Sequence, residues 1–170
     1  MRALLCLPLL FVASQVLSAT QIYATQAEFL TASFDEAPSR HSYWLNDADK
    51  QAAKKILRHS QRQLRVKYWS NEIKTAWVLE EIGKERPITI GVLIADNQVV
   101  SVTILAFRES RGWEVKFPFF TQQFVGMQLS DKQKLDRSID NITGATLSVR
   151  AVKRAVAWAL YLNQQATFEQ

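Results

Sequence analysis

The strongest constraint on the fold is a pair of apolar runs, ITIGVLIA at 88–95 and QVVSVTILAF at 98–107, with only Asp96 and Asn97 between them. Aspartate and asparagine tolerate the positive φ angles that a two-residue hairpin turn requires. The segment therefore predicts two antiparallel strands joined by a tight turn.

Segments before this hairpin add further elements. Side chains of alternating polarity over 63–69 and 73–81 predict two more strands. A capping box from Thr25 to Glu28 predicts a short helix that ends near Phe34. The period of the apolar positions thus changes from that of a helix to that of a strand along the chain.

The stretch DEAPSRHSYW, residues 35–44, is expected to break the helical pattern. A second helix is expected over residues 48–60, after a cap at Asn46 or Asp47. Helices therefore precede the strands in this chain.

The C-terminal part predicts the most regular helix, beginning near Ala145 or Leu147. Four apolar side chains at helical spacing form one face of it: Val149, Val152, Val156 and Leu160. The complete pattern predicts an α+β fold, with an antiparallel sheet of about four strands, N-terminal helices and a C-terminal helix that follows a loop.

Residues 1–19 have the organisation of a secretory signal peptide. Arg2 precedes an apolar run from Ala3 to about Val12, and small residues follow near Ser18. The run is shorter than the about 20 residues that span a bilayer. We therefore expect cleavage after residue 18 or 19 and a periplasmic or secreted protein, with an uncleaved, membrane-associated form as the alternative.

Composition excludes several kinds of site. Cys6, the only cysteine, lies inside this segment, so the mature chain would have no thiol for disulfides, zinc thiolates, iron–sulfur clusters or attached haem. The histidines, His41 and His59, stand apart from any partner and do not predict a metal site. A net charge of +5 is too small and too dispersed to predict nucleic-acid binding.

The loop DNITGAT, residues 140–146, lies directly before the last helix. A helix N-terminus presents free N–H groups and the positive end of a dipole, which together favour a phosphate. Gly144 allows a close approach of the backbone, and Thr146 adds a hydroxyl. The alternative interpretation is that Thr143 or Asp140 only caps the helix.

The early turns of this helix contain three basic residues, Arg150, Lys153 and Arg154. Cations near a helix N-terminus oppose the helix dipole, and a bound anion would remove that conflict. An ordinary solvated face is the alternative explanation.

DNITGAT resembles the Asp-x-x-(Ser/Thr)-Gly-Ala-Thr signature of FMN-binding domains, which occur in flavin subunits of sodium-pumping NADH:quinone oxidoreductases, in Rnf-type complexes and in small exported proteins. The resemblance extends from about Ile88 to Ala157. It implies an FMN-binding domain at 83–170. With the signal peptide expected at 1–19, the remaining residues, 20–82, form an N-terminal extension of helices and strands.

In that family, a flavin transferase outside the cytoplasm joins the phosphate of FMN to the last threonine of the signature. The resemblance therefore implies covalent FMN on Thr146. Further candidates for cofactor binding in and next to the signature are Asp140, Thr143, Gly144, Ala145 and Ser148. Thr143 and Ser148 could instead serve only as helix caps. Arg150 is a candidate partner of the phosphate.

The segment FRESRGWE, residues 107–114, corresponds to a His-x-Glu-Thr-Pro-Gly-like loop of many family members. Glu109 and Gly112 match this loop, whereas Phe107 and Arg111 replace its histidine and proline. Arg111 is a candidate to stabilise the reduced flavin, and Trp113 is a candidate to stack on the ring.

These observations predict an exported electron-transfer flavoprotein, an electron carrier or redox subunit rather than a self-sufficient enzyme. Its expected partners are a flavin transferase for maturation and a membrane redox protein or periplasmic cytochrome for electron exchange. Two alternatives stay open: an anion-binding or sensor module of the same fold without flavin, and a small flavin-dependent reductase of an exported substrate.

Overall fold

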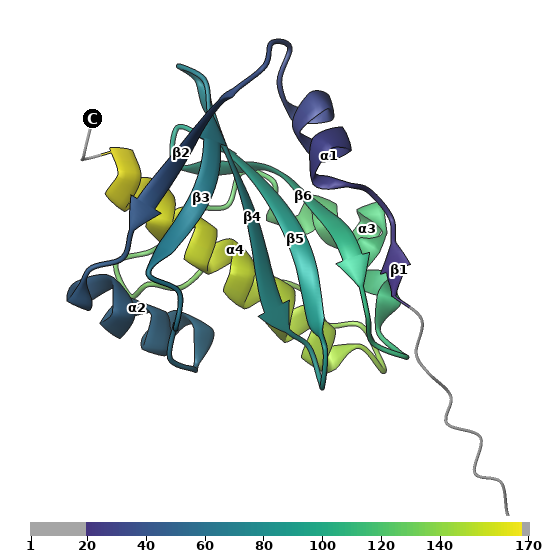
Figure 1. Cartoon of the computed structure of the whole chain (residues 1–170). Coiled ribbons are helices and arrows are strands. Elements are labelled where there is room, and N and C mark those ends of the chain that lie inside the picture. The colour runs from purple at the N-terminus through teal and green to yellow at the C-terminus, as the bar shows by residue number, and fades with distance from the viewer. Residues whose placement is uncertain (1–19, 168–170) are drawn as a thin grey trace, which may run out of the picture.

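The computed structural model describes residues 20–167. Its centre is one antiparallel sheet of six strands in the order β1-β6-β5-β4-β3-β2 (Figure 1). The strands are β1 (Gln21–Ile22), β2 (Ser39–Trp44), β3 (Arg65–Ser70), β4 (Lys74–Ile82), β5 (Pro87–Ala95) and β6 (Gln98–Phe107). The predicted α+β class is confirmed, with more strands than the four expected.

The helices are α1 (Gln26–Ser33), α2 (Asp47–Leu57), α3 (Pro118–Thr121) and α4 (Thr146–Thr167), with 3-10 turns η1 (Trp113–Lys116) and η2 (Gln122–Phe124). The predicted caps are confirmed, because Thr25 and Asn46 each form a capping box with the acidic residue three positions later. No helix within residues 20–167 is long and apolar enough to cross a membrane.

The hairpin predicted over residues 88–107 is the β5–β6 pair. Asp96 and Asn97 form its turn with φ angles of 49° and 59°, and Ala95 pairs with Gln98. Two consecutive residues with positive φ are the conformation of a type I′ turn. The predicted hairpin is therefore confirmed, including its turn residues.

The two additional strands lie at the edges of the sheet. β2 occupies part of the stretch that was expected only to break the helical pattern, and that prediction was wrong for Ser39–Trp44. Within β2 only Tyr43 is buried, so its sequence has no clear alternation of apolar side chains. An edge strand with one weakly buried face has little periodic signal.

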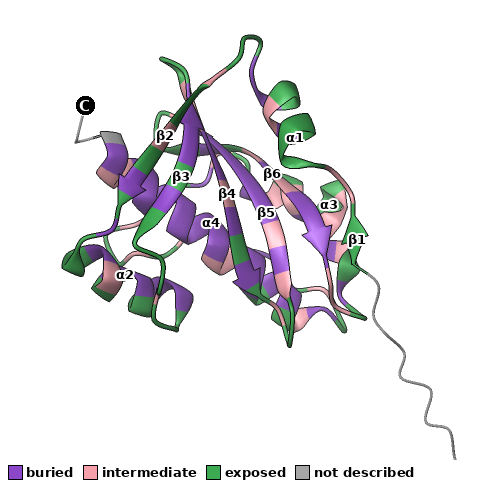
Figure 2. Ribbon diagram, viewed as in Figure 1, coloured by how far each residue is buried: buried purple, intermediate pink, exposed green. Residues whose placement is uncertain are grey.

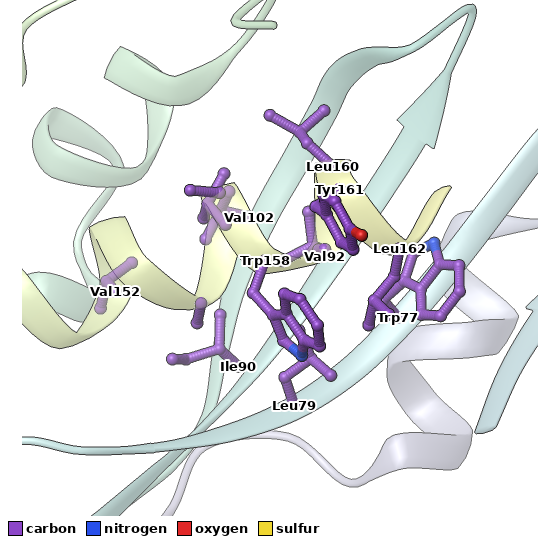
Figure 3. Close-up of a cluster of buried hydrophobic side chains, with 14 of the residues drawn as sticks. Trp77, Leu79, Ile90, Val92, Val102, Val152, Trp158, Leu160, Tyr161 and Leu162 are labelled. Atoms are coloured by element: carbon purple, nitrogen blue, oxygen red, sulfur yellow. The ribbon is translucent and has the colours of Figure 1, made fainter. Parts of the chain in front are cut away.

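Helix α4 packs across one face of the sheet (Figure 1). Trp77 of β4 and Trp158 of α4 are both almost completely buried there, and the Trp158 ring stacks on Tyr161 at 5.2 Å (Figure 3). The predicted apolar face of α4 is buried, but so are most of its other side chains (Figure 2). The sheet, α2 and the segment around η1 each contact α4, which explains this burial on several sides.

Asp49 fixes α2 against α4. Its buried carboxylate accepts hydrogen bonds from the hydroxyls of Tyr161 at 2.9 Å and Tyr43 at 3.0 Å, and from the backbone N–H of Asn46 at 2.8 Å. Burial and the adjacent Asp49 carboxylate raise the pKa of Tyr161. Three donors on one carboxylate offset the cost of burying its charge.

The opposite face of the sheet carries α1. Phe29 and Phe34 pack there with Trp69, Leu93 and Leu105, and form a second apolar cluster. Because α1 covers this face, the sheet has apolar partners on both sides. Both the start of α4 and the loop after β6 are therefore attached to a sheet that has an apolar core on each face.

Candidate functional site

The predicted loop turns sharply before α4. The N–H of Ala145 donates to the carbonyl of Ile142 at 2.9 Å, and Gly144 between them has a φ of +82°. Helix α4 begins at Thr146, as predicted. Ala145 has no side-chain oxygen that can cap the helix, so the first N–H groups are available to an anion.

Thr146 is half-buried, and its Oγ1 accepts a hydrogen bond from Asn141 Nδ2 at 3.0 Å. Asn141 occupies a position of the signature that has no fixed residue type, and sequence reasoning therefore missed it. The hydrogen bond orients the hydroxyl and leaves its own proton free to be donated.

A pocket of about 550 Å³ lies between this loop, the loop after β6 and the β4–β5 turn. This volume is within the range of about 300–1,000 Å³ that is usual for small-molecule sites. The pocket is lined by Lys84, Glu109, Ser110, Arg111, Gly144, Ala145, Thr146, Leu147 and Ser148. Six of the predicted site residues are therefore brought together, although they come from two distant parts of the chain.

Two glycines with positive φ lie next to the start of α4. Gly112 has a φ of +88° and is buried, and a Cβ atom at this position would overlap with Ser148 Oγ. The loop after β6 therefore packs directly on the first turn of α4. A Cβ atom on Gly144, by contrast, would meet nothing within 4 Å, so the space beside the uncapped N–H groups can hold a phosphate.

Glu109 anchors the β4–β5 turn to the pocket. Its Oε1 accepts the backbone N–H groups of Lys84 and Glu85 at 2.6 Å and of Arg86 at 2.9 Å. Partial burial acts to raise the pKa of Glu109, but the three N–H groups and the Lys84 charge outweigh burial and lower it. The Glu109 carboxylate thus fixes the backbone of the β4–β5 turn, which forms part of the pocket wall.

Glu109→Gln should reduce stability at neutral pH, because a neutral amide accepts these three hydrogen bonds less strongly than a carboxylate. A folded-state pKa below the usual value of 4.5 gives stability that is present above this pH and is lost as the pH falls through the lowered value. The difference in unfolding free energy between the natural protein and the Glu109→Gln variant, measured in urea, should therefore shrink as the pH falls below 4.5. A pH-independent difference would contradict this role.

Four predicted site residues lie outside the pocket lining. Asp140 and Thr143 are exposed, and the N–H of Asp140 donates to Gln123 Oε1 at 2.8 Å. Trp113 is 39% exposed and packs edge-on against Phe117 at 5.4 Å. Arg150 is exposed on α4. Sequence reasoning missed three lining residues, Lys84, Ser110 and Leu147, because their types alone indicate no function.

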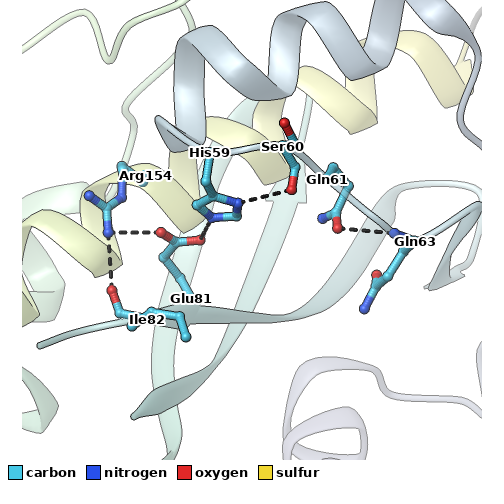
Figure 4. Close-up of polar contacts among 7 residues, drawn as sticks. All are labelled: His59, Ser60, Gln61, Gln63, Glu81, Ile82 and Arg154. Atoms are coloured by element: carbon cyan, nitrogen blue, oxygen red, sulfur yellow. Dashed lines mark hydrogen bonds and ion pairs between the residues drawn. The ribbon is translucent and has the colours of Figure 1, made fainter. Parts of the chain in front are cut away.

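The basic start of α4 has an internal counter-ion. Glu81, which is 2% exposed, lies 2.8 Å from Arg154 through Oε1 and 3.0 Å from His59 Nε2 through Oε2 (Figure 4). Arg154 also donates to the carbonyl of Ile82 at 3.0 Å. The expectation that His59 has no partner was wrong, and so was that for His41, which lies 3.0 Å from the Ser70 hydroxyl.

Comparison with known proteins assigns a domain family to the part of the chain that forms the pocket. Residues 83–161 match the sequence model of the FMN-binding domain family, and every residue that lines the pocket falls within this range. The chain contains an FMN-binding domain. No curated protein was found to match the chain. The match gives FMN as the cofactor of this domain, and strands β1–β4 extend its sheet beyond the matched residues.

Proposed function

We propose that the protein is an exported electron-transfer flavoprotein that carries FMN covalently on Thr146. The observation that carries this proposal is the position of Thr146 Oγ1. Thr146 lines the pocket within the FMN-binding domain, and it lies beside the open space at Gly144 and at the uncapped start of α4. A phosphate there would be adjacent both to the hydroxyl and to the helix N–H groups.

The attachment needs a flavin transferase and a flavin nucleotide as donor. The Thr146 oxygen forms a bond to phosphorus, the bond from phosphorus to the donor's leaving group breaks, and the hydroxyl proton goes to the leaving group or to a base of the transferase. Asn141 holds the threonine side chain during this step through its hydrogen bond. Lys84 and Arg111 line the pocket and balance the charge of the phosphodiester.

A covalent link suits an exposed site. Holding a flavin at nanomolar affinity through contacts alone requires about 12 kcal/mol of net binding free energy. The Gly144 turn is exposed on the surface, so a non-covalent flavin would have few enclosing contacts. Attachment prevents dissociation while leaving the cofactor accessible to other proteins.

When bound, FMN accepts and donates electrons singly or in pairs. An exposed flavin pocket favours exchange with another redox protein, and a membrane redox protein or a periplasmic cytochrome fits this role. Export rests on residues 1–19, which lie outside the described residues. Purification from the native envelope followed by N-terminal sequencing would test it.

The test of attachment is the intact mass of protein made together with a flavin transferase. We expect a gain equal to FMN less one water, and a yellow colour that persists after denaturation. Peptide mapping should place the flavin on Thr146. Flavin on Thr143 or Ser148 would overturn the assignment, and an unmodified, colourless protein would favour the anion-binding alternative.

A further inference from the structure

A second hollow, of about 490 Å³, lies between α2, the loop 130–137 and α4. We call it the basic hollow. It is lined by Lys55, Ile56, Arg58, Lys132, Gln133, Lys134, Leu135, Arg137, Lys153, Arg154 and Ala157. Seven of these residues are basic, and none of the described residues that line the hollow is acidic.

Two of the seven cations already have partners. Arg154 pairs with the buried Glu81, and Arg137 donates to the carbonyl of Val125 at 3.0 Å and lies 3.9 Å from Asp136. The remaining five side chains make no ion pair or side-chain hydrogen bond with any residue of 20–167: Lys55, Arg58, Lys132, Lys134 and Lys153. Like charges gathered around one concave surface create a positive potential that attracts anions.

The loop that supplies two of these cations is ordered. Leu129 and Leu135 form a β-bridge, and Ser130 donates to the carbonyl of Lys134 through its N–H at 2.8 Å and its hydroxyl at 2.9 Å. These bonds close a tight turn around Lys132. The charges are therefore presented by a fixed backbone, while the long side chains remain adaptable.

The basic hollow is aligned with the flavin site along α4. Thr146, Arg150, Lys153 and Ala157 are separated by four, three and four residues, so they lie on one face of the helix. Seven residues of helix place Lys153 about 10 Å along the axis from Thr146. A protein seated on the hollow would thus lie beside the flavin.

We propose that the basic hollow is the docking surface for the acidic face of the redox protein that exchanges electrons with the flavin. This inference rests on the proposed function. Most of the cations are exposed at the rim rather than buried around a closed cavity. Such an arrangement favours fast, salt-sensitive association with a protein over tight binding of a small anion.

The test compares two variants with the same loss of charge. The first replaces Lys55, Lys134 and Lys153 by Gln in the basic hollow. The control replaces Arg40, Arg62 and Lys67 by Gln, and these three are exposed residues that do not line the hollow. Neither set includes a residue that lines the flavin pocket.

The first probe is a fluorescent peptide of about ten residues rich in glutamate, whose binding is followed by anisotropy at low salt, where screening is weak. The hollow variant should bind about tenfold more weakly than the natural protein, and the control within about twofold. The Thr146→Ala protein, which carries no flavin, should bind the peptide normally. Failure of flavin attachment would therefore leave this result intact.

The second measurement is the oxidation rate of the reduced, flavinylated protein by ferricyanide, which is anionic, and by hexaammineruthenium(III), which is cationic. The hollow variant should react more slowly with the first and no more slowly with the second. Equal effects of both variants on peptide binding would overturn the proposal. One-to-one binding of pyrophosphate that survives high salt would also overturn it, and would indicate a small-anion site.

Discussion

Thr146→Ala should abolish covalent flavin attachment completely while leaving the fold intact. The substitution removes the only oxygen that can form the phosphoester at this position. Alanine is well tolerated at a helix start, and Thr146 is only half-buried, so the free energy of unfolding should change by less than about 1 kcal/mol. Intact mass, colour after denaturation and urea unfolding measure these effects.

Thr146→Ser is the matched control, since it keeps the hydroxyl and loses one methyl group. We expect this variant to be flavinylated, although more slowly. Asn141→Ala should also slow attachment, because Thr146 Oγ1 loses its hydrogen-bond donor. Full attachment to the alanine variant would show that another residue carries the flavin.

Gly112→Ala should be the most damaging small substitution at the site. A non-glycine residue at a φ of +88° costs about 1–2 kcal/mol, and overlap with Ser148 Oγ adds a packing cost of about 1–3 kcal/mol. We expect a loss of about 2–5 kcal/mol of unfolding free energy, together with slower flavin attachment, because the loop can no longer pack on α4.

Gly144→Ala separates the cost of backbone strain from the cost of steric overlap. Its φ of +82° imposes a similar backbone strain, but the new methyl group meets no atom within 4 Å. It should therefore lose only about 1–2 kcal/mol. Chemical denaturation of the two variants without flavin gives the comparison. Equal losses would show that overlap of the added methyl group at position 112 with Ser148 has no energetic cost.

Short sequence patterns correctly predicted the features that depend only on interactions between neighbouring residues. The Thr25 and Asn46 capping boxes, the Asp96–Asn97 turn and the start of α4 each depend on residues within a few positions of one another. Such features are present in the sequence because capping and turn formation involve neighbouring backbone groups. The edge strand β2 was missed because pairing with β3, rather than its own pattern, makes it a strand.

The sequence by itself determined the attachment candidate, since the DNITGAT signature places a hydroxyl, a glycine and a helix start in seven consecutive residues. Only the tertiary structure decided what surrounds it. Glu109 binds the β4–β5 turn, Arg154 is held by Glu81, and Lys55 and Lys134 meet Lys153 around one hollow. These contacts join residues far apart in the chain, and they exist because packing of α4 against the sheet and of α2 against α4 brings distant segments together.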